Sequence, residues 1–430
     1  MTMAREMKDS GVKWIGEIPR EWGLSKIKYE ITGYKAGPFG SSLITDKLDH
    51  EGEIVVYTPE HVALMSDSCD NDLFLPKERR YEMSQFIVKE GDIIFPIVGS
   101  LGRAMRISSK MKNGIINQRL AKFRLKSEKV FEEYFMWLFS RSSFYKTYID
   151  VFQRGTIIVN LTKSIVNEMP LPLPPISEQK AIADYLDKKC EEIDGLLEDL
   201  AAEVKTLTEY KKSIIAETVT HGLNPNAPMK AVSLGWIEQI PKQWEVARIA
   251  SVYSVRNEKV SDKDFPPLSV TMKGIVPQLE NAAKTKHGDE RKLIRKGDFV
   301  INSRSDRRGS CGISDYDGSC SLINTVLSPR EEMNPKYYNW LFHTSSFADE
   351  FYKWGYGIVD DLWTTNWGAM RRIQIPMPPL DEQAEIAAYL DEKIPIIDQS
   401  ITDKNTQIET LKAYKSSLIY EYVTGKKEVI

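Results

Sequence analysis

The chain has 430 residues, of which 42% are hydrophobic and 28% are charged, and its formal net charge is −3. This length accommodates two globular domains, and the composition is ordinary for a soluble protein. The small net charge excludes a general polyanion binder, so any nucleic-acid contact must come from local basic patches. The four cysteines lack paired spacing, and neither a signal peptide nor an apolar run of spanning length occurs. We therefore expect a cytoplasmic protein with reduced thiols and no membrane partner.

Two sequence signatures occur once in each half of the chain. The first opens each half, where Trp14-Ile-Gly-Glu-Ile-Pro-Arg-Glu-Trp22 matches Trp236-Ile-Glu-Gln-Ile-Pro-Lys-Gln-Trp244. The second closes each half, where Pro170-Leu-Pro-Leu-Pro-Pro-Ile-Ser-Glu-Gln179 matches Ile375-Pro-Met-Pro-Pro-Leu-Asp-Glu-Gln383. A repeat this long indicates a duplicated domain with its helix rather than a solenoid unit. We expect a protein that performs one task twice, in two places.

Each half is predicted to be a mixed α+β domain followed by a long helix. Short β-branched runs predict strands at 53–57, 92–95 and 114–117, and the aromatic residues of 134–148 predict a helix that faces the core. The loops between the shared segments differ in length, which is typical of one frame that carries two different recognition surfaces. The predicted segments are a first domain (1–176), a first helix (177–221), a second domain with a short linker (222–379), a second helix (380–425) and a tail (426–430).

The ends of the two long helices carry recognisable signals. Ser177 and Asp381 follow proline-rich segments and are predicted N-caps, and Gly222 and Gly425 are predicted stops. Pro395 predicts a kink or a restart in the second helix, because proline lacks the backbone N–H and clashes with the preceding turn.

Apolar residues recur at alternating spacings of four and three along both helices, which predicts a coiled-coil seam. The alternative is that each helix packs only on its own domain. The equivalent placement of the two helices in a duplicated chain favours their pairing with each other. The predicted seam residues are Ile193, Leu197, Leu200, Val204, Leu207, Ile214, Ile397, Ile401, Ile408, Leu411 and Leu418.

The stretch 103–126 is the best local sign of a nucleic-acid partner, because it is rich in Lys and Arg and contains neither Asp nor Glu. Clustered cations without counter-charges fit contact with phosphates, although a solvated strand face is the alternative. The side chains at 117–119 are of the types that read adenine and guanine edges. We take 302–309 as the counterpart in the second half. The candidate DNA-binding residues are Arg103, Arg106, Lys110, Lys112, Asn117, Gln118, Arg119, Lys122, Arg304, Arg307 and Arg308.

No catalytic constellation emerges from the sequence. The five histidines are scattered without metal-ligand spacing, and no glycine-rich phosphate-binding loop occurs. Asn334-Pro-Lys-Tyr337 differs from the Asn-Pro-Pro-Tyr motif of amino methyltransferases by one residue, but no cofactor-binding glycine loop precedes it. We therefore expect a chain with no catalytic residues, no metal and no cofactor.

The two signatures, together with Gly37-Pro-Phe-Gly-Ser-Ser-Leu43, resemble those of the specificity (S) subunits of type I restriction–modification systems, over essentially the whole chain. The resemblance implies an α+β fold, in which two pseudo-symmetric mixed α/β target-recognition domains are joined by two long helices that form an antiparallel coiled coil. It further implies a non-catalytic subunit that binds double-stranded DNA. In that family the helices carry methyltransferase (M) subunits and, through them, restriction (R) subunits.

From this arrangement we expect each domain to read one half of a bipartite, gapped target, with the helices setting the spacer. Two other classes stay open. One is a coiled-coil scaffold that binds only proteins, and the other is a stand-alone DNA methyltransferase. Salt-sensitive binding to a defined duplex would argue against the first, and the missing cofactor loop argues against the second.

Overall fold

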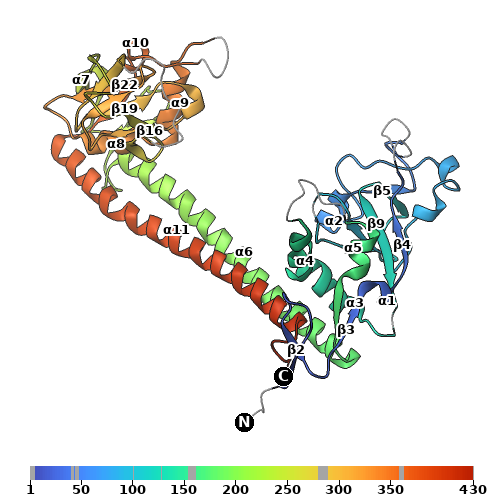
Figure 1. Ribbon diagram of the computed structural model, residues 1–430. Helices are drawn as coiled ribbons and strands as arrows, with labels where there is room; N and C mark the ends of the chain where they lie inside the picture. Colours follow the sequence, from blue (N-terminus) through green and yellow to red (C-terminus); the bar gives the residue numbers. More distant parts are fainter. Residues whose placement is uncertain are drawn as a thin grey trace. The chain divides into compact units, whose positions relative to one another are not determined.

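The computed structural model describes residues 5–39, 43, 48–99, 101–126, 128–153, 161–278, 289–357 and 363–429. The chain divides into two compact units, which comprise Met1–Asp199 with Gln407–Ile430, and Leu200–Thr406. Each unit contains one α+β domain and segments of two long helices (Figure 1). In the part of the chain that the structure describes, no helix is both long enough and apolar enough to cross a membrane.

The first domain alternates short strands with short helices before it enters the first long helix, α6. Its elements are β1 (Met7–Asp9), β2 (Glu17–Pro19), β3 (Gly23–Lys26), α1 (Ile27–Glu30), β4 (Ile31–Ala36), β5 (Val55–Tyr57), α2 (Pro59–Leu64), η3 (Lys77–Arg79), η4 (Ser84–Phe86), β6 (Ile93–Pro96), β7 (Met105–Arg106), β8 (Gly114–Ile116), β9 (Leu120–Leu125), α3 (Glu132–Met136), the π-helical η5 (Trp137–Arg141), α4 (Phe144–Gln153), α5 (Lys163–Glu168), β10 (Pro170–Leu173) and α6 (Ile176–His221). The three predicted strands correspond to β5, β6 and β8.

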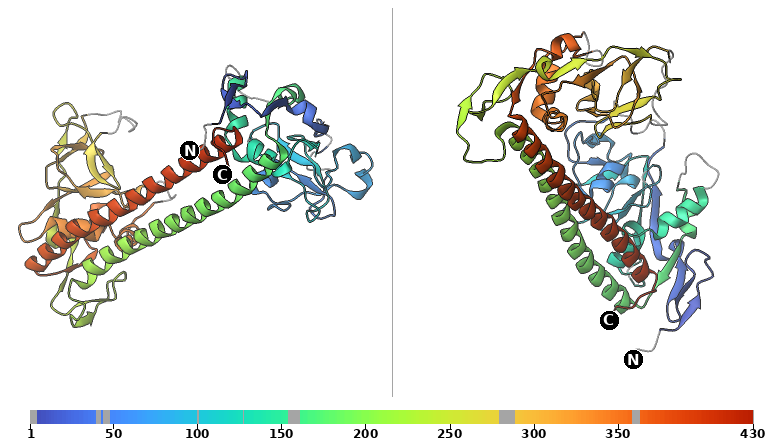
Figure 2. Two further views of the ribbon diagram at one scale, coloured as in Figure 1. Left: turned by 90° about the horizontal axis from the view of Figure 1, so that it is seen from below. Right: turned by 90° about the vertical axis from the view of Figure 1, so that its left-hand side faces the viewer.

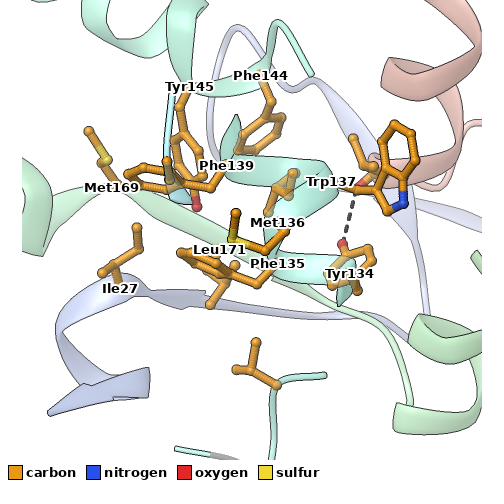
Figure 3. Close-up of a cluster of buried hydrophobic side chains, with 14 of the residues drawn as sticks. Ile27, Tyr134, Phe135, Met136, Trp137, Phe139, Phe144, Tyr145, Met169 and Leu171 are labelled. Atoms are coloured by element: carbon orange, nitrogen blue, oxygen red, sulfur yellow. Dashed lines mark hydrogen bonds between the residues drawn. The ribbon is translucent and has the colours of Figure 1, made fainter. Parts of the chain in front are cut away.

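A four-stranded antiparallel sheet with the order β4-β9-β6-β7 forms the centre of this domain. Aromatic side chains of α3, η5 and α4 cluster in the core of the domain (Figure 3). They pack on the sheet, since the ring of Phe123 in β9 lies 5.8 Å from that of Phe135 and 6.0 Å from that of Phe139. These aromatics are buried, as predicted. The predicted helix is not continuous, however, because Ser142 is extended and its hydroxyl accepts a hydrogen bond from the backbone N–H of Phe144 at the start of α4.

The second domain repeats this sheet with different insertions. Its elements are β11 (Met229–Ala231), β12 (Gln239–Pro241), β13 (Glu245–Arg248), α7 (Ile249–Val252), β14 (Tyr253–Val255), β15 (Lys259–Val260), β16 (Leu268–Thr271), β17 (Gly274–Pro277), β18 (Arg291–Ile294), β19 (Phe299–Asn302), η6 (Ser305–Arg307), β20 (Cys311–Ile313), β21 (Gly318–Cys320), β22 (Asn324–Pro329), α8 (Pro335–Phe342), α9 (Ser345–Lys353), α10 (Trp367–Met370), β23 (Gln374–Met377) and α11 (Leu380–Val423). The sheet order β14-β22-β19-β20 corresponds strand by strand to that of the first domain.

Each domain also has a small apolar core of its own around the strands that are not shared with the other domain. In the first domain, a second apolar cluster that includes Val55, Tyr57 and Ile115 lies around the parallel pair β5–β8. In the second domain, a smaller cluster that includes Leu268 and Val326 involves the β16–β17 hairpin. The shared sheet therefore supports a different insertion in each domain.

The two long helices, α6 with 46 residues and α11 with 44, pair side by side in every view (Figures 1 and 2). The predicted seam positions are buried or half-buried, and Ile193, Ile397 and Leu418 are the most enclosed. Ion pairs join Asp194 to Lys415 in the first unit, and Glu203 to Lys404 and Lys211 to Asp398 in the second. Because the partner's number falls as the first number rises, the pairing is antiparallel.

The predicted N-caps of these helices are wrong. The helices begin at Ile176 and Leu380, and the carbonyls of Pro175 and Pro379 accept the first helical hydrogen bonds, so Ser177 and Asp381 lie inside the first turn and are not N-caps. Helix α11 continues through Pro395 as one helix, so the restart offered as one of two possibilities does not occur. Pro395 is exposed, so water can replace the one backbone hydrogen bond that proline removes.

The predicted ends of the two long helices are confirmed. Gly222 and Gly425 follow the two helices with φ of +78° and +71°. This left-handed conformation costs glycine little and strains other residues, so it ends each helix where the chain must turn.

Candidate nucleic-acid interface

Three connections of the first domain meet where β6 ends and β9 begins. Pro96 is paired with Leu120, the backbone N–H of Ile97 donates to the carbonyl of Arg119 at 2.9 Å, and that of Gly37 donates to the carbonyl of Leu120 at 2.8 Å. The segments 37–39, 97–99 and 117–119 therefore converge. We call this region the first loop end. Gly40, Ser41 and Ser42 of the predicted motif lie outside the described residues.

The turn at Asn117, Gln118 and Arg119 is the most polar part of the first loop end. The side-chain Oδ1 of Asn117 accepts from the backbone N–H of Arg119 at 2.9 Å, which fixes the turn, while Gln118 and Arg119 are exposed. A Cβ atom at Gly37 would lie 1.9 Å from the carbonyl oxygen of Asn117, so only glycine allows the two segments to approach. The close approach accounts for the first residue of the Gly37-Pro-Phe motif.

Most other cations of 103–126 have counter-charges that the sequence did not reveal, because acids of other elements approach them. Lys122 has a side chain that is only 12% exposed and lies 2.9 Å from Asp92. Arg106 lies 2.8 Å from Glu132. The Nζ of Lys112 lies 3.8 Å from Asp72 and donates to Ser68 Oγ. The premise of a cluster without counter-charges is thus wrong for these three residues.

The remaining two predicted cations of this stretch lie at the surface. Arg103 donates to the backbone carbonyl of Ala63 at 3.4 Å, and Lys110 is exposed. Asn117, Gln118 and Arg119 are therefore the predicted residues that the structure brings together at the first loop end.

The second loop end forms in the same way where β19 ends and β22 begins. Asn302 pairs with Asn324, and the backbone N–H of Thr365 donates to the carbonyl of Ser303 at 2.9 Å. The described residues of 303–310, 321–323 and 356–365 therefore meet at this end of the sheet.

The predicted arginines of the second half all lie in the connection after β19. Arg304 donates its backbone N–H to Asn302 Oδ1 at 3.0 Å, and Arg308 is ion-paired with Asp349. Arg307 is 68% exposed, with its neighbour Asp306 at 3.7 Å. Strand pairing shows that this connection corresponds to the one after β6, so 302–309 is not the counterpart of the Asn117 turn. That counterpart is 321–323.

The residues that attach each domain to its helix were not predicted, although both signatures contain them. In the first unit, Trp22 Nε1 donates to Glu178 Oε2 at 3.0 Å. In the second, Trp244 Nε1 donates to Glu382 Oε2 at 2.8 Å. The second Trp of the opening signature thus binds the Glu of the closing signature, and the joint recurrence of the two signatures was the signal that could have suggested this.

The Gln that follows each Glu holds the start of a short helix. Gln179 Oε1 accepts from the backbone N–H of Phe131 at 2.7 Å, and Gln383 Oε1 accepts from that of Asn334 at 2.9 Å. Both side chains also donate to a proline carbonyl just before their own helix. We call the Trp–Glu and Gln contacts of each unit its helix joint.

Each domain also holds the end of the opposite long helix. Tyr134 donates its hydroxyl to the carbonyl of Val423 at 3.1 Å, and Tyr337 donates to that of Val219 at 2.8 Å. Burial raises the pKa of both tyrosines well above the ordinary value, so both hydroxyls remain protonated donors. The domain in each unit therefore forms hydrogen bonds with the beginning of one long helix and with the end of the other.

Among the described residues, His61, Cys69 and Asp72 place three potential metal ligands within 4.8 Å of one another, which the sequence spacing did not suggest. His61 Nδ1 accepts the backbone N–H of Thr58, so the proton is on Nε2, which faces Asp72 Oδ1 at 3.0 Å. Burial raises the pKa of Cys69, which keeps the thiol protonated. These contacts explain the cluster as polar residues that stabilise the part of the first domain around β5 and α2.

The fold defines a class: a chain with two related α+β domains, each attached to a pair of antiparallel helices. The family model for the type I restriction modification DNA specificity domain matches residues 39–206 and again residues 241–410. The two matches together cover more than half of the chain, and the chain belongs to this family.

Relatives and solved structures agree with this assignment. The MjaVIII specificity subunit of a type I restriction enzyme from Methanocaldococcus jannaschii is 23% identical, over 96% of this chain and 94% of the relative. A chain from a solved type I R-M system superimposes with a TM-score of 0.71 at 16% identity, covering 95% of this chain and 99% of that one. The HsdS subunit from Thermoanaerobacter tengcongensis gives 0.55 at 17% identity, covering 95% and 98%. The structural similarities show the fold.

Proposed function

We propose that this chain is the subunit that gives a type I restriction–modification complex its DNA sequence specificity. Each domain reads one half of a bipartite double-stranded target through its loop end, and the paired helices carry methyltransferase subunits and, through them, restriction subunits. The chain itself takes no part in bond making. The observation that supports this proposal most strongly is that the two domains share a sheet and a helix joint while their loop ends differ.

The test is the pattern of methylation produced when the chain is co-expressed with the methyltransferase encoded beside it, read base by base across a genome. We expect a single bipartite motif. Exchange of one domain for that of a relative should change one half of the motif and leave the other. A folded chain that produces no motif would contradict the proposal and favour the protein-binding scaffold. Methyl transfer from S-adenosylmethionine by the purified chain alone would favour a stand-alone methyltransferase.

The same methylation experiment also measures the length of the spacer between the two half-sites. Four residues inserted at equivalent turns of both α6 and α11 lengthen a helix by about 6 Å, which corresponds to roughly two base pairs of duplex. We expect the spacer to lengthen by that amount while both half-sites are retained. An unchanged spacer would show that the helices do not set it.

A further inference from the structure

The turn before β22 occupies the place in the second domain that the Asn117 turn occupies in the first. In each case the residue that begins the strand closes the turn: Leu120 donates its backbone N–H to Asn117 O at 3.1 Å, and Asn324 donates to Ser321 O at 3.0 Å. Both strand starts are paired with the last residue of the central neighbouring strand. Leu322 and Ile323 therefore stand where Gln118 and Arg119 stand in the first domain.

The two turns present opposite chemistry at the same place. Gln118 and Arg119 offer hydrogen-bond donors and acceptors, whereas Leu322 and Ile323 offer only branched apolar side chains, with 42% and 39% of their surface exposed. One exposed leucine needs no explanation. Two consecutive exposed apolar residues on a tight turn, at the position of the polar turn in a duplicated domain, do require one.

The surroundings of this turn suit a nucleic acid. Arg307, in the connection after β19, is exposed, and the backbone of Arg304 pairs with that of Thr364. Thr364 in turn pairs with Tyr356, a residue that is 59% exposed. The apolar turn therefore shares this end of the sheet with exposed cationic and aromatic side chains, a combination that is complementary to base edges flanked by phosphates.

Resting on the proposed function, we propose that Leu322 and Ile323 read thymine in the half-site of the second domain by contacting its C5-methyl group. In the major groove this methyl is the one apolar group that distinguishes a base edge, and apolar side chains recognise it by contact. Insertion between base steps, the other use of apolar side chains, needs a side chain that projects freely. More than half of the surface of each of these two residues is covered by the domain, which favours contact with a base edge over insertion.

The test uses the full chain in complex with its methyltransferase and synthetic duplexes that carry the motif found by methylation mapping. Each thymine of the second domain's half-site is replaced in turn by deoxyuridine, which removes only the methyl group. We expect about fourfold weaker binding at one or two positions, the factor that corresponds to one buried methyl group. Thymines in the first domain's half-site serve as the internal control.

The matched variants connect this loss to the turn. Leu322→Ala and Ile323→Ala should weaken binding to the thymine duplex and abolish the difference between thymine and deoxyuridine. Leu223→Ala truncates a leucine of similar exposure, 40%, just after α6, and should preserve that difference. Specific binding with no effect of deoxyuridine anywhere in the half-site, or a half-site without A·T pairs, overturns the thymine contact and leaves the proposed function intact. Absence of any sequence-specific binding overturns both.

Discussion

The helix joints of the two units repeat the same Trp–Glu and Gln hydrogen bonds, whereas the loop ends agree only in their backbone. At the joints, the Trp–Glu hydrogen bonds are 3.0 and 2.8 Å long in the two units, and the Gln hydrogen bonds to the short helix are 2.7 and 2.9 Å long. At the loop ends, one turn carries Gln118 and Arg119 and the other carries Leu322 and Ile323. Attachment to the common helices permits little chemical variation, whereas the loop ends are where one duplicated domain acquired two different surfaces.

The largest expected effects come from the buried tryptophans of the joints. Trp22 and Trp244 are 1% and 0% exposed, so Trp22→Ala and Trp244→Ala should each cost about 3–5 kcal/mol in the unit concerned. Hydrogen exchange measured by mass spectrometry should show lost protection in that unit, with Phe replacements as milder controls. A variant that left both units fully protected would show that the joint contributes little to stability.

At the first loop end, we expect Arg119 to read a base and Lys122 to support the fold. Arg119→Ala should weaken binding to the specific duplex by about 1–3 kcal/mol and affect a scrambled duplex much less. Lys122→Ala should lower the melting temperature instead, because it leaves the buried Asp92 with fewer partners. Binding titrations of both duplexes at two salt concentrations distinguish a base contact of Arg119 from a phosphate contact. Equal losses on both duplexes, with a shallower salt dependence, would mark Arg119 as a phosphate contact.

One ionic contact distinguishes the two joints. Glu178 also lies 2.7 Å from Arg5, whereas the position that corresponds to Arg5 in the second unit is Ala227. Glu178→Gln should therefore cost about 1–2 kcal/mol more than Glu382→Gln. Local stability from hydrogen exchange at low and high NaCl measures the difference, which should shrink at high salt. Arg5→Ala is the matched control and should make the two replacements equivalent.

The smallest expected effect is a dependence on pH in the first domain. Burial lowers the pKa of His61, against the opposing charge of Asp72. The unfolded chain therefore binds this proton at higher pH than the folded chain, so the stability is complete above the ordinary histidine pKa of about 6.5 and is lost as the pH falls through the folded pKa. Hydrogen exchange between pH 7.5 and 5.5 should show this loss in the wild type and a smaller one in His61→Gln. An equal loss of protection with falling pH in the two proteins would show that His61 is not the group responsible.

Much of the architecture could be predicted from the sequence because it rests on local, repeated patterns. The duplicated signatures predicted two equivalent domains, the 4–3 spacing of apolar residues predicted that the helices pair, and the glycines at 222 and 425 marked the helix ends. The buried aromatics of the first domain followed from their helical spacing. Each of these patterns depends on the residue and its near neighbours, or on a comparison of the two halves.

Charge partners and surfaces required the tertiary structure. No inspection of 103–126 reveals that Asp92 and Glu132 neutralise Lys122 and Arg106, because these acids belong to other elements. Strand register likewise decided that Leu322 and Ile323, rather than the arginines at 304–308, correspond to the Asn117 turn. Repetition and periodicity along the chain were sufficient to identify two domains and their paired helices. The side chains that contact one another could be identified only in the folded structure, because those contacts join residues far apart in sequence.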